Sequence, residues 1–313
     1  MKKNSRILIT GAGGKVGKRL SEILQKNGYK NVIPITRQEV DLTNSDDVNN
    51  FFINANPEYV FMLAAKVGGI QDNLLTPAEY LIENLKLQIN VFEAMVKCRP
   101  IKCIFACSSG AYPTNSPNPK TEDMFMSGKN EQSNEGYILA KILGVKLAEM
   151  LNKQHGLLTI SPMIANIYGT YDNYNLDRAH VISSLIKKIA IAKKNQDKAV
   201  SLLGTGNARR EFIHVDDVVS GLILLMDKYN KNEIINLGIG KDISIKELAS
   251  LLATKLNYTG YFNWDGLSTE GMKQRLMDSS KIEKIGFKSK ISLEEGIDRT
   301  IEEFYQLNPD LAC

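Results

Sequence analysis

RILITGAGGKVG, residues 6–17, decides the fold class of this chain. A short run of β-branched and aliphatic residues at 6–10 leads directly into glycines. The segment that follows, up to Gly28, has the apolar spacing of a helix with a glycine stop. A strand that passes through a glycine-rich turn into a helix is the first unit of a doubly wound α/β fold.

The rest of the first half repeats this alternation of strands and helices. We expect strands at 31–36, 59–65, 101–109 and 157–169, and helices at 45–56, 77–97 and 136–154. Ser45 is the predicted cap of the helix at 45–56, and the polar segment 114–134 is a predicted loop. Strands joined by helical crossovers predict a parallel, doubly wound (Rossmann) sheet.

The pattern becomes less regular beyond Tyr171, with predicted helices at 179–194 and 244–256 and strands near 200 and 234. We expect residues 1–169 to form a dinucleotide-binding domain, to which a segment of about 211–236 returns. Residues 170–313 are expected to form mainly a smaller α+β substrate domain. That domain would close over the carboxyl edge of the sheet, where such folds bind their ligands.

Composition excludes several other classes of function. The chain has 313 residues, of which 43% are hydrophobic and 24% charged, as in soluble enzymes. Its net charge of +4 comes from scattered lysines, so no nucleic-acid groove is expected. No apolar run approaches the roughly 18 residues of a membrane span, and no leader is evident, which favours a cytoplasmic protein. The four cysteines and three histidines have no metal-site spacing, so we expect no metal.

Gly11, Gly14 and Gly17 have a G-x-x-G-x-x-G spacing at the first strand–helix junction. Glycines let the backbone approach a pyrophosphate, and the helix N-terminus supplies free N–H donors. A purely structural glycine turn is the alternative, but the position favours a dinucleotide. The predicted cofactor site also includes Lys15, Val16, Ala64 and Ala65.

The end of the second predicted strand selects the dinucleotide. An NAD site has Asp or Glu there for the ribose 2′-hydroxyl, whereas this strand ends at Thr36-Arg37. A guanidinium suits the 2′-phosphate of NADP(H), although a solvated arginine is the alternative. Asp41 and Leu42 are expected near the adenine.

Tyr137 and Lys141 are spaced as Y-x-x-x-K, one turn apart on a predicted helix, and Ser108 ends the fourth predicted strand. This set resembles the Ser/Tyr/Lys set of the extended short-chain dehydrogenase/reductase family. A ketone that takes up hydride needs a proton on its oxygen. Tyr137 would supply it, because the Lys141 ammonium lowers a tyrosine pKa. Lys141 would also hold the nicotinamide ribose, and Ser108 the carbonyl oxygen.

A closer resemblance, to the GDP-L-fucose synthases, extends over essentially the whole chain. It rests on AAKVGGI (64–70), SSxxYP (108–113), NIYG (166–169), HVI (180–182) and REFIHVDD (210–217). The resemblance implies a homodimer formed by the helices at 77–97 and 136–154, and a GDP-linked 4-keto sugar as substrate. The implied substrate contacts are Ser109, Asn166 (also near the cofactor), His180, Lys188 and Arg210. Arg275, in a segment that differs from the family, is the expected further anion contact. For Arg210, a structural ion pair with Asp216 or Asp217 is the alternative.

Gly110 departs from that family. The synthases epimerise C3 and C5 before reducing C4, using a cysteine two residues after the catalytic serine together with a histidine. His180 is present here, but the cysteine position is Gly110. Strand alternation turns Cys107 away from Ser108, so it is not expected to substitute. The sequence therefore predicts an NADPH-dependent 4-ketoreductase that does not epimerise, acting on a 6-deoxyhexose or a heptose.

Other functions remain open. A bifunctional epimerase/reductase, an NAD-dependent nucleotide-sugar 4-epimerase and a non-catalytic dinucleotide-binding regulator are the alternatives. A 4,6-dehydratase is disfavoured, because such enzymes have Asp-Glu where this chain has Ser109-Gly110. The segment WDGLSTEGMKQRLMD (264–278) and Leu203 also differ from the fucose synthases, which points to an altered substrate.

Overall fold

The computed structural model describes residues 1–266 and 272–312. A seven-stranded sheet forms the larger unit, with the order β10-β6-β4-β3-β1-β2 and with β5 beside β6. Every pairing in it is parallel. Its strands are β1 (Arg6–Thr10), β2 (Asn31–Ile35), β3 (Tyr59–Met62), β4 (Lys102–Phe105), β5 (Cys107–Ser108), β6 (Thr159–Ile164) and β10 (Ile234–Leu237). The predicted doubly wound α/β fold is confirmed.

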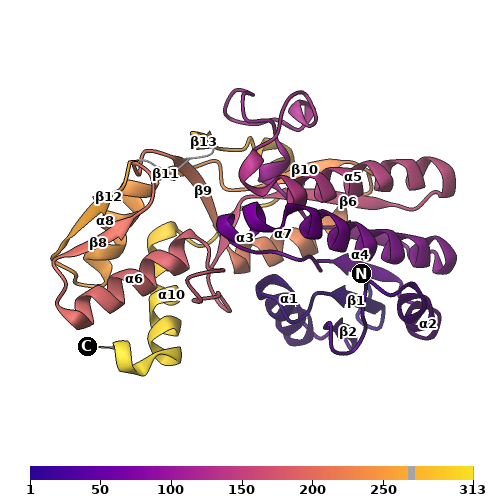
Figure 1. Ribbon diagram of the computed structural model, residues 1–313. Helices are drawn as coiled ribbons and strands as arrows, with labels where there is room; N and C mark the ends of the chain where they lie inside the picture. Colours follow the sequence, from indigo (N-terminus) through magenta and orange to yellow (C-terminus); the bar gives the residue numbers. More distant parts are fainter. Residues whose placement is uncertain (267–271, 313) are drawn as a thin grey trace.

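Helices cover this sheet, with α4 and α5 packed side by side (Figure 1). The helices of this unit are α1 (Lys15–Lys26), α2 (Ser45–Ala55), α4 (Pro77–Cys98), α5 (Glu135–His155) and α7 (Val215–Lys228). A short helix, α3 (Ile70–Leu75), was not predicted.

The cap of α2 is Asn44, so the prediction of Ser45 was wrong. The Asn44 side-chain oxygen accepts from the amides of Asp46 and Asp47, at 2.9 and 3.3 Å. Ser45 is already the first helical residue. Both residue types cap helices well, and the backbone geometry decides between neighbours.

Two predicted strands are interrupted in the structure. The run 101–109 divides into β4 and β5 at Ala106, and the run 157–169 divides into β6 and β7 (Asn166–Tyr168) at Ala165. β7 leaves the large sheet and pairs with β9 (Arg209–His214). Periodicity within a strand does not reveal a change of pairing partner, so the sequence could not show these breaks.

The smaller unit contains most of the chain beyond β7. β9 lies between β11 (Asp242–Ser244) and β13 (Gln274–Arg275), while β8 (Ala199–Leu202) pairs with β12 (Tyr261–Trp264). Its helices are α6 (Val181–Asn195), α8 (Ile245–Lys255) and α10 (Leu293–Leu307), whereas α9 (Ser280–Ile285) packs against β10 of the large sheet. α6, α8 and α10 lie on the far side of β9 from the large sheet (Figure 1).

Each unit has its own buried core. The first is centred on the parallel sheet and includes residues from α7 and β10, whereas the second joins α6, α8 and α10. We propose a domain boundary near residue 169, with α7 and β10 returning to the first domain. The carboxyl ends of β1, β5 and β6 then face the second unit, where ligands bind in such folds. In the described part of the chain, no helix is long and apolar enough to cross a membrane.

Candidate active site

Ala106, between β4 and β5, contacts α5, the helix that contains Tyr137 and Lys141. The Lys141 ammonium donates to the Ala106 carbonyl at 2.8 Å, and this carbonyl precedes Ser108 by two residues. The same ammonium lies 5.8 Å from the centre of the Tyr137 ring. Lys141 is 2% exposed. The structure therefore brings the Y-x-x-x-K turn of α5 against the end of β5.

Burial sets the protonation states of this pair. Desolvation lowers the pKa of Lys141 to about 8, with Cys107 opposing the shift. Desolvation also raises the pKa of Tyr137 well above its ordinary value, and Cys107 adds to the shift. Near neutral pH, Tyr137 therefore carries its proton and Lys141 its charge. The expectation that Lys141 lowers the pKa of Tyr137 was wrong, because desolvation dominates; Tyr137 nevertheless holds the proton that a substrate oxygen would need.

Position 110 faces the Ser108 hydroxyl. The hydroxyl accepts from the Gly110 amide at 3.1 Å, in the turn Ser109–Ala111. A Cβ placed on Gly110 would lie 3.4 Å from the Ser108 Oγ and 2.7 Å from the Ile138 Cδ1. Ile138 is fully buried and follows Tyr137 directly. The end of its side chain would therefore have to shift to admit a side chain at position 110.

Cys107 is a buried core residue. It is 4% exposed, whereas Ser108 is half-buried. Burial raises the pKa of the Cys107 thiol to about 11, and Lys141 opposes that shift. A buried and protonated thiol is a poor base.

Two glycines of the loop, Gly11 and Gly17, leave no room for a side chain. A Cβ on Gly11, where φ is +70°, would lie 2.7 Å from the Ala64 amide nitrogen. One on Gly17 would lie 2.4 Å from the Gly11 carbonyl oxygen. Gly14 is the N-cap of α1 and is exposed, so the free amides of the first turn are available to an anion. These features fit the pyrophosphate of a dinucleotide.

The other predicted cofactor residues surround this loop. Val16 is half-buried on α1, while Ala64 and Ala65 follow β3, with the Ala64 amide donating to the Thr10 hydroxyl at 3.2 Å. The Leu42 carbonyl accepts from the Asn90 side chain at 3.0 Å. Lys15 differs from the rest: its ammonium binds Asp172 at 2.7 Å and the Ile167 carbonyl at 3.0 Å, both beyond the large sheet.

Arg37 is exposed in the turn after β2. Asp41 accepts from the Thr43 amide and hydroxyl, bonds that lower its pKa, and Arg37 lowers it further. Sequence reasoning missed Glu39, an acidic residue near this strand end. Its carboxylate is occupied by the Thr36 amide at 2.6 Å and the Thr36 hydroxyl at 2.8 Å.

The predicted sugar contacts lie where the two units meet. Ser109 is buried after β5, and the Asn166 side chain donates to the Glu211 carbonyl at 2.8 Å. His180 is the N-cap of α6 and remains solvent-accessible. Desolvation of its imidazole lowers the pKa of His180, and the Lys15 ammonium lowers it further. The Asp172 carboxylate opposes both effects. His180 is therefore held toward its neutral form.

The predicted anion contacts come from α6, β9 and β13. Lys188 is half-buried on α6. Arg210 and Arg275 are directly paired on neighbouring strands, so their side chains lie on the same face of the small sheet. Arg275 is buried and forms an ion pair with Glu131, a partner that the sequence did not suggest. Residues 267–271 of the divergent 264–278 segment lie outside the described residues.

The carboxylates proposed as structural partners of Arg210 have other contacts. Asp216 pairs with Arg19 at 2.6 Å and with Arg299 at 3.8 Å. Asp217 accepts from the Ser289 hydroxyl and from the amides of Lys290 and Ile291.

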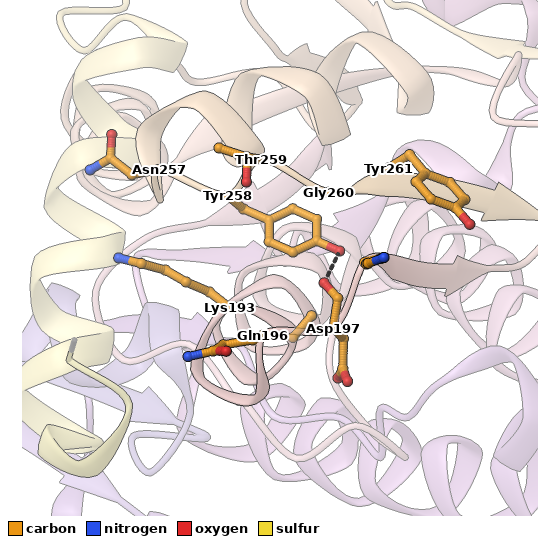
Figure 2. A pocket seen from close by; sticks show the side chains of 10 residues that line it. Lys193, Gln196, Asp197, Asn257, Tyr258, Thr259, Gly260 and Tyr261 are labelled. Carbon is orange, nitrogen blue, oxygen red and sulfur yellow. Dashed lines mark hydrogen bonds between the residues drawn. The ribbon is translucent and has the colours of Figure 1, made fainter.

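A shallow recess of about 430 Å³ lies elsewhere, between the loops that follow α6 and α8 (Figure 2). Its wall includes Asp197, whose carbonyl accepts from the Tyr258 hydroxyl at 3.0 Å. No predicted site residue lines this recess. In residues 1–266 and 272–312, no group of three or more His, Cys, Asp and Glu side chains could hold a metal ion.

Comparisons with known proteins agree with this geometry. Residues 7–238 match the family model described as "NAD dependent epimerase/dehydratase family". A probable GDP-L-fucose synthase 1 of Oryza sativa subsp. japonica is 39% identical over 97% of this chain and 93% of its own length.

Solved structures of GDP-sugar reductases are also similar to this chain. A GDP-6-OMe-4-keto-L-xylo-heptose reductase from C. jejuni is 33% identical, with a TM-score of 0.92 over 98% of this chain and 99% of its own. A GDP-mannoheptose C4 reductase from Campylobacter jejuni, solved with NADP bound, is 34% identical. Its TM-score is 0.88 over 97% of this chain and 99% of its own.

Proposed function

The chain belongs to the NAD dependent epimerase/dehydratase family, and we propose that it uses NADPH to reduce the C4 ketone of a GDP-linked 4-keto sugar without epimerising C3 or C5. The observation that carries the proposal is the pair Gly110 and Ile138, which leaves the Ser/Tyr/Lys set intact but removes the side chain beside Ser108.

Reduction requires one hydride on carbon and one proton on oxygen. NADPH, when bound, supplies the hydride. Tyr137, which carries its proton near neutral pH, supplies that proton to the ketone oxygen as charge develops there. Lys141 stabilises the resulting tyrosinate, and Ser108 donates a hydrogen bond to the same oxygen. Solvent then returns the proton to Tyr137.

The cofactor assignment rests on the residues around the glycine loop. The exposed amides at the start of α1 suit the pyrophosphate, and Arg37 suits a 2′-phosphate. Glu39 is the acidic residue nearest the end of β2, and its carboxylate is bound to Thr36. NADP in the related C4 reductase supports the same choice.

Epimerisation at C3 or C5 requires a base on one face of the carbon and an acid on the other. Gly110 supplies neither, and Cys107 is buried with a raised pKa. His180 alone would serve one face only. We infer that the reaction ends at reduction of C4 and that both neighbouring carbons keep their configuration.

The nucleotide and the sugar are inferred from the related proteins. The matched synthase and both reductases are named for GDP-linked sugars, and the names of the two reductases specify heptoses. Lys188, Arg210 and Arg275 are the cations proposed for the diphosphate. A heptose or a 6-deoxyhexose fits this proposal.

We also propose that the protein is a homodimer. Ile82 and Ile89 on α4, and Leu143 and Met150 on α5, are exposed apolar side chains seven residues apart on two adjacent helices. Such a surface is complementary to a second copy of itself. Light scattering should give twice the chain mass, and Ile89→Glu should give the monomer. Ile53→Glu, at an exposed isoleucine of α2, is the matched control.

A panel of GDP-4-keto sugars, assayed for NADPH oxidation, tests the proposed activity. We expect turnover with at least one 6-deoxyhexose or heptose, and little with UDP-linked sugars. If no member oxidises NADPH while GDP-sugar epimers interconvert, the protein is a 4-epimerase and the proposal is wrong.

A further inference from the structure

One face of α1 contacts the two-residue segment Tyr171–Asp172 that follows β7. The Lys15 ammonium lies 2.7 Å from the Asp172 carboxylate. The Lys18 ammonium lies 5.3 Å from the centre of the Tyr171 ring, and the Tyr171 hydroxyl donates to Glu22. Residues 15, 18 and 22 share one helix face. We call these five residues the α1 clasp.

The same segment is anchored from the opposite side. The Tyr171 amide donates to Glu303 of α10 at 2.8 Å. Tyr171 has φ of +66°, a left-handed conformation that costs a non-glycine residue free energy and persists where its surroundings fix it. The clasp therefore links α1 of the large sheet to α10 of the smaller unit through a constrained residue.

The Lys15–Asp172 pair is buried, with side-chain exposures of 13% and 1%. A buried ion pair is rarely more stable than an apolar pair of the same size, because both charges lose their hydration. One oxygen of Asp172 and one of Glu303 are buried without a hydrogen-bond partner among the described residues. The pair is thus poorly explained as a stabilising contact, and a role in positioning accounts for it better.

The position of each partner indicates what the pair connects. Lys15 lies inside the glycine loop, between Gly14 and Gly17, where the dinucleotide phosphates are proposed to bind. Asp172 begins the segment that runs to His180 at the start of α6. Both charges also act on the His180 imidazole. One ammonium therefore contacts the segments that form the two ligand sites.

We propose that the α1 clasp couples the two sites, so that a dinucleotide on the glycine loop fixes the segment 171–180 and thereby strengthens binding of the nucleotide sugar. Lys15 and Asp172 are positioning residues in this account. The identity of the two ligands rests on the proposed function above. Thermodynamic linkage requires the effect to be reciprocal, so the sugar nucleotide strengthens dinucleotide binding by the same factor.

Calorimetry of GDP binding, with and without saturating NADP⁺, tests the coupling. We expect NADP⁺ to tighten GDP binding in the wild type by a factor of roughly 5 to 150, the usual range for coupled sites. Asp172→Asn keeps the shape but removes the charge pair, and should reduce this factor to below about 2. Asp177→Asn, an exposed residue of the same segment, is the matched control and should keep the wild-type factor.

Hydrogen exchange provides a readout that needs only NADPH. Saturating NADPH should slow amide exchange across residues 171–180 in the wild type and in Asp177→Asn, but not in Asp172→Asn. The double variant Lys15→Met/Asp172→Asn removes both charges of the pair, so it should fold and lack the protection as well.

Three results distinguish the possible failures. A wild type in which NADP⁺ leaves GDP affinity unchanged overturns the coupling. An Asp172→Asn variant that retains both the wild-type factor and the protection also overturns it. If the wild type does not bind GDP at all, the proposed substrate class is wrong. The hydrogen-exchange experiment then tests by itself whether the α1 clasp transmits dinucleotide binding to residues 171–180.

Discussion

The Cδ1 methyl of Ile138 lies 2.7 Å from the point where a Cβ would stand on Gly110. The Ser108 hydroxyl lies 3.4 Å from the same point. Position 110 is thus directed at Ser108, and Ile138, the residue after Tyr137, lies in the space that a side chain there would enter. In the proposed function, Gly110 and Ile138 together keep an additional acid or base away from Ser108.

This relationship predicts a favourable coupling between substitutions at the two positions. Gly110→Cys should destabilise the fold by about 1–3 kcal/mol, because the new side chain meets Ile138. Ile138→Ala should cost about 2–5 kcal/mol through the cavity it leaves. Denaturant unfolding of the double variant should show a loss smaller than the sum, by about 0.5–3 kcal/mol. Strict additivity would mean that the two side chains do not compete for the same space.

Arg37 should determine the choice of cofactor. Arg37→Ala removes a charge-assisted bond to the 2′-phosphate, worth about 1.5–3 kcal/mol. The ratio of kcat/KM for NADPH to that for NADH should fall roughly 10- to 150-fold. Lys30→Ala, an exposed cation before the opposite end of β2, controls for the loss of positive charge. An unchanged ratio in Arg37→Ala would show that another group reads the phosphate.

Tyr137 should be the proton donor. Tyr137→Phe keeps the ring and removes only the hydroxyl, so kcat should fall by about 10²- to 10⁴-fold. NADPH affinity, measured by fluorescence titration, should stay close to that of the wild type. Near wild-type turnover in this variant would assign the proton to a different group.

Lys141 should give the activity an alkaline limit. Burial lowers its pKa to about 8, so the ammonium is charged below that pH and loses its proton above it. The value of kcat/KM for NADPH reports the free enzyme and should fall about tenfold per pH unit on the alkaline side. Lys141→Arg stays charged, so its alkaline limb should move to higher pH. A wild-type profile that is flat to about pH 9.5 would contradict this assignment.

Much of the fold could be predicted because its signals are local. The strand–glycine–helix unit at the start and the alternation of strands and helices gave the parallel sheet, which the structure confirms. The breaks at Ala106 and Ala165 could not be predicted, because they depend on which strand lies alongside. The cap of α2 was misplaced by one residue, since Asn44 and Ser45 are both good caps.

In the candidate site, too, the features with local sequence signals could be predicted and the long-range contacts could not. Ser108, Tyr137 and Lys141 follow from spacing along one strand end and one helix. The contact between Gly110 and Ile138, the Lys15–Asp172 pair and the Arg275–Glu131 pair join segments far apart in the sequence. The sequence shows Ile138 next to Tyr137, but only the packing of α5 on the turn after β5 shows where its side chain lies.

The central claim is that the site reduces C4 and leaves C3 and C5 unchanged, and NMR of the product formed in D₂O tests it most directly. The wild-type protein is incubated with NADPH and a GDP-4-keto sugar that turns over, beside a control without enzyme. We predict protium at C3 and C5, both with the configuration of the substrate. Deuterium at either carbon above the control, together with an inverted centre, would contradict the account, because it would require an acid–base pair that Gly110 and Ile138 are proposed to exclude.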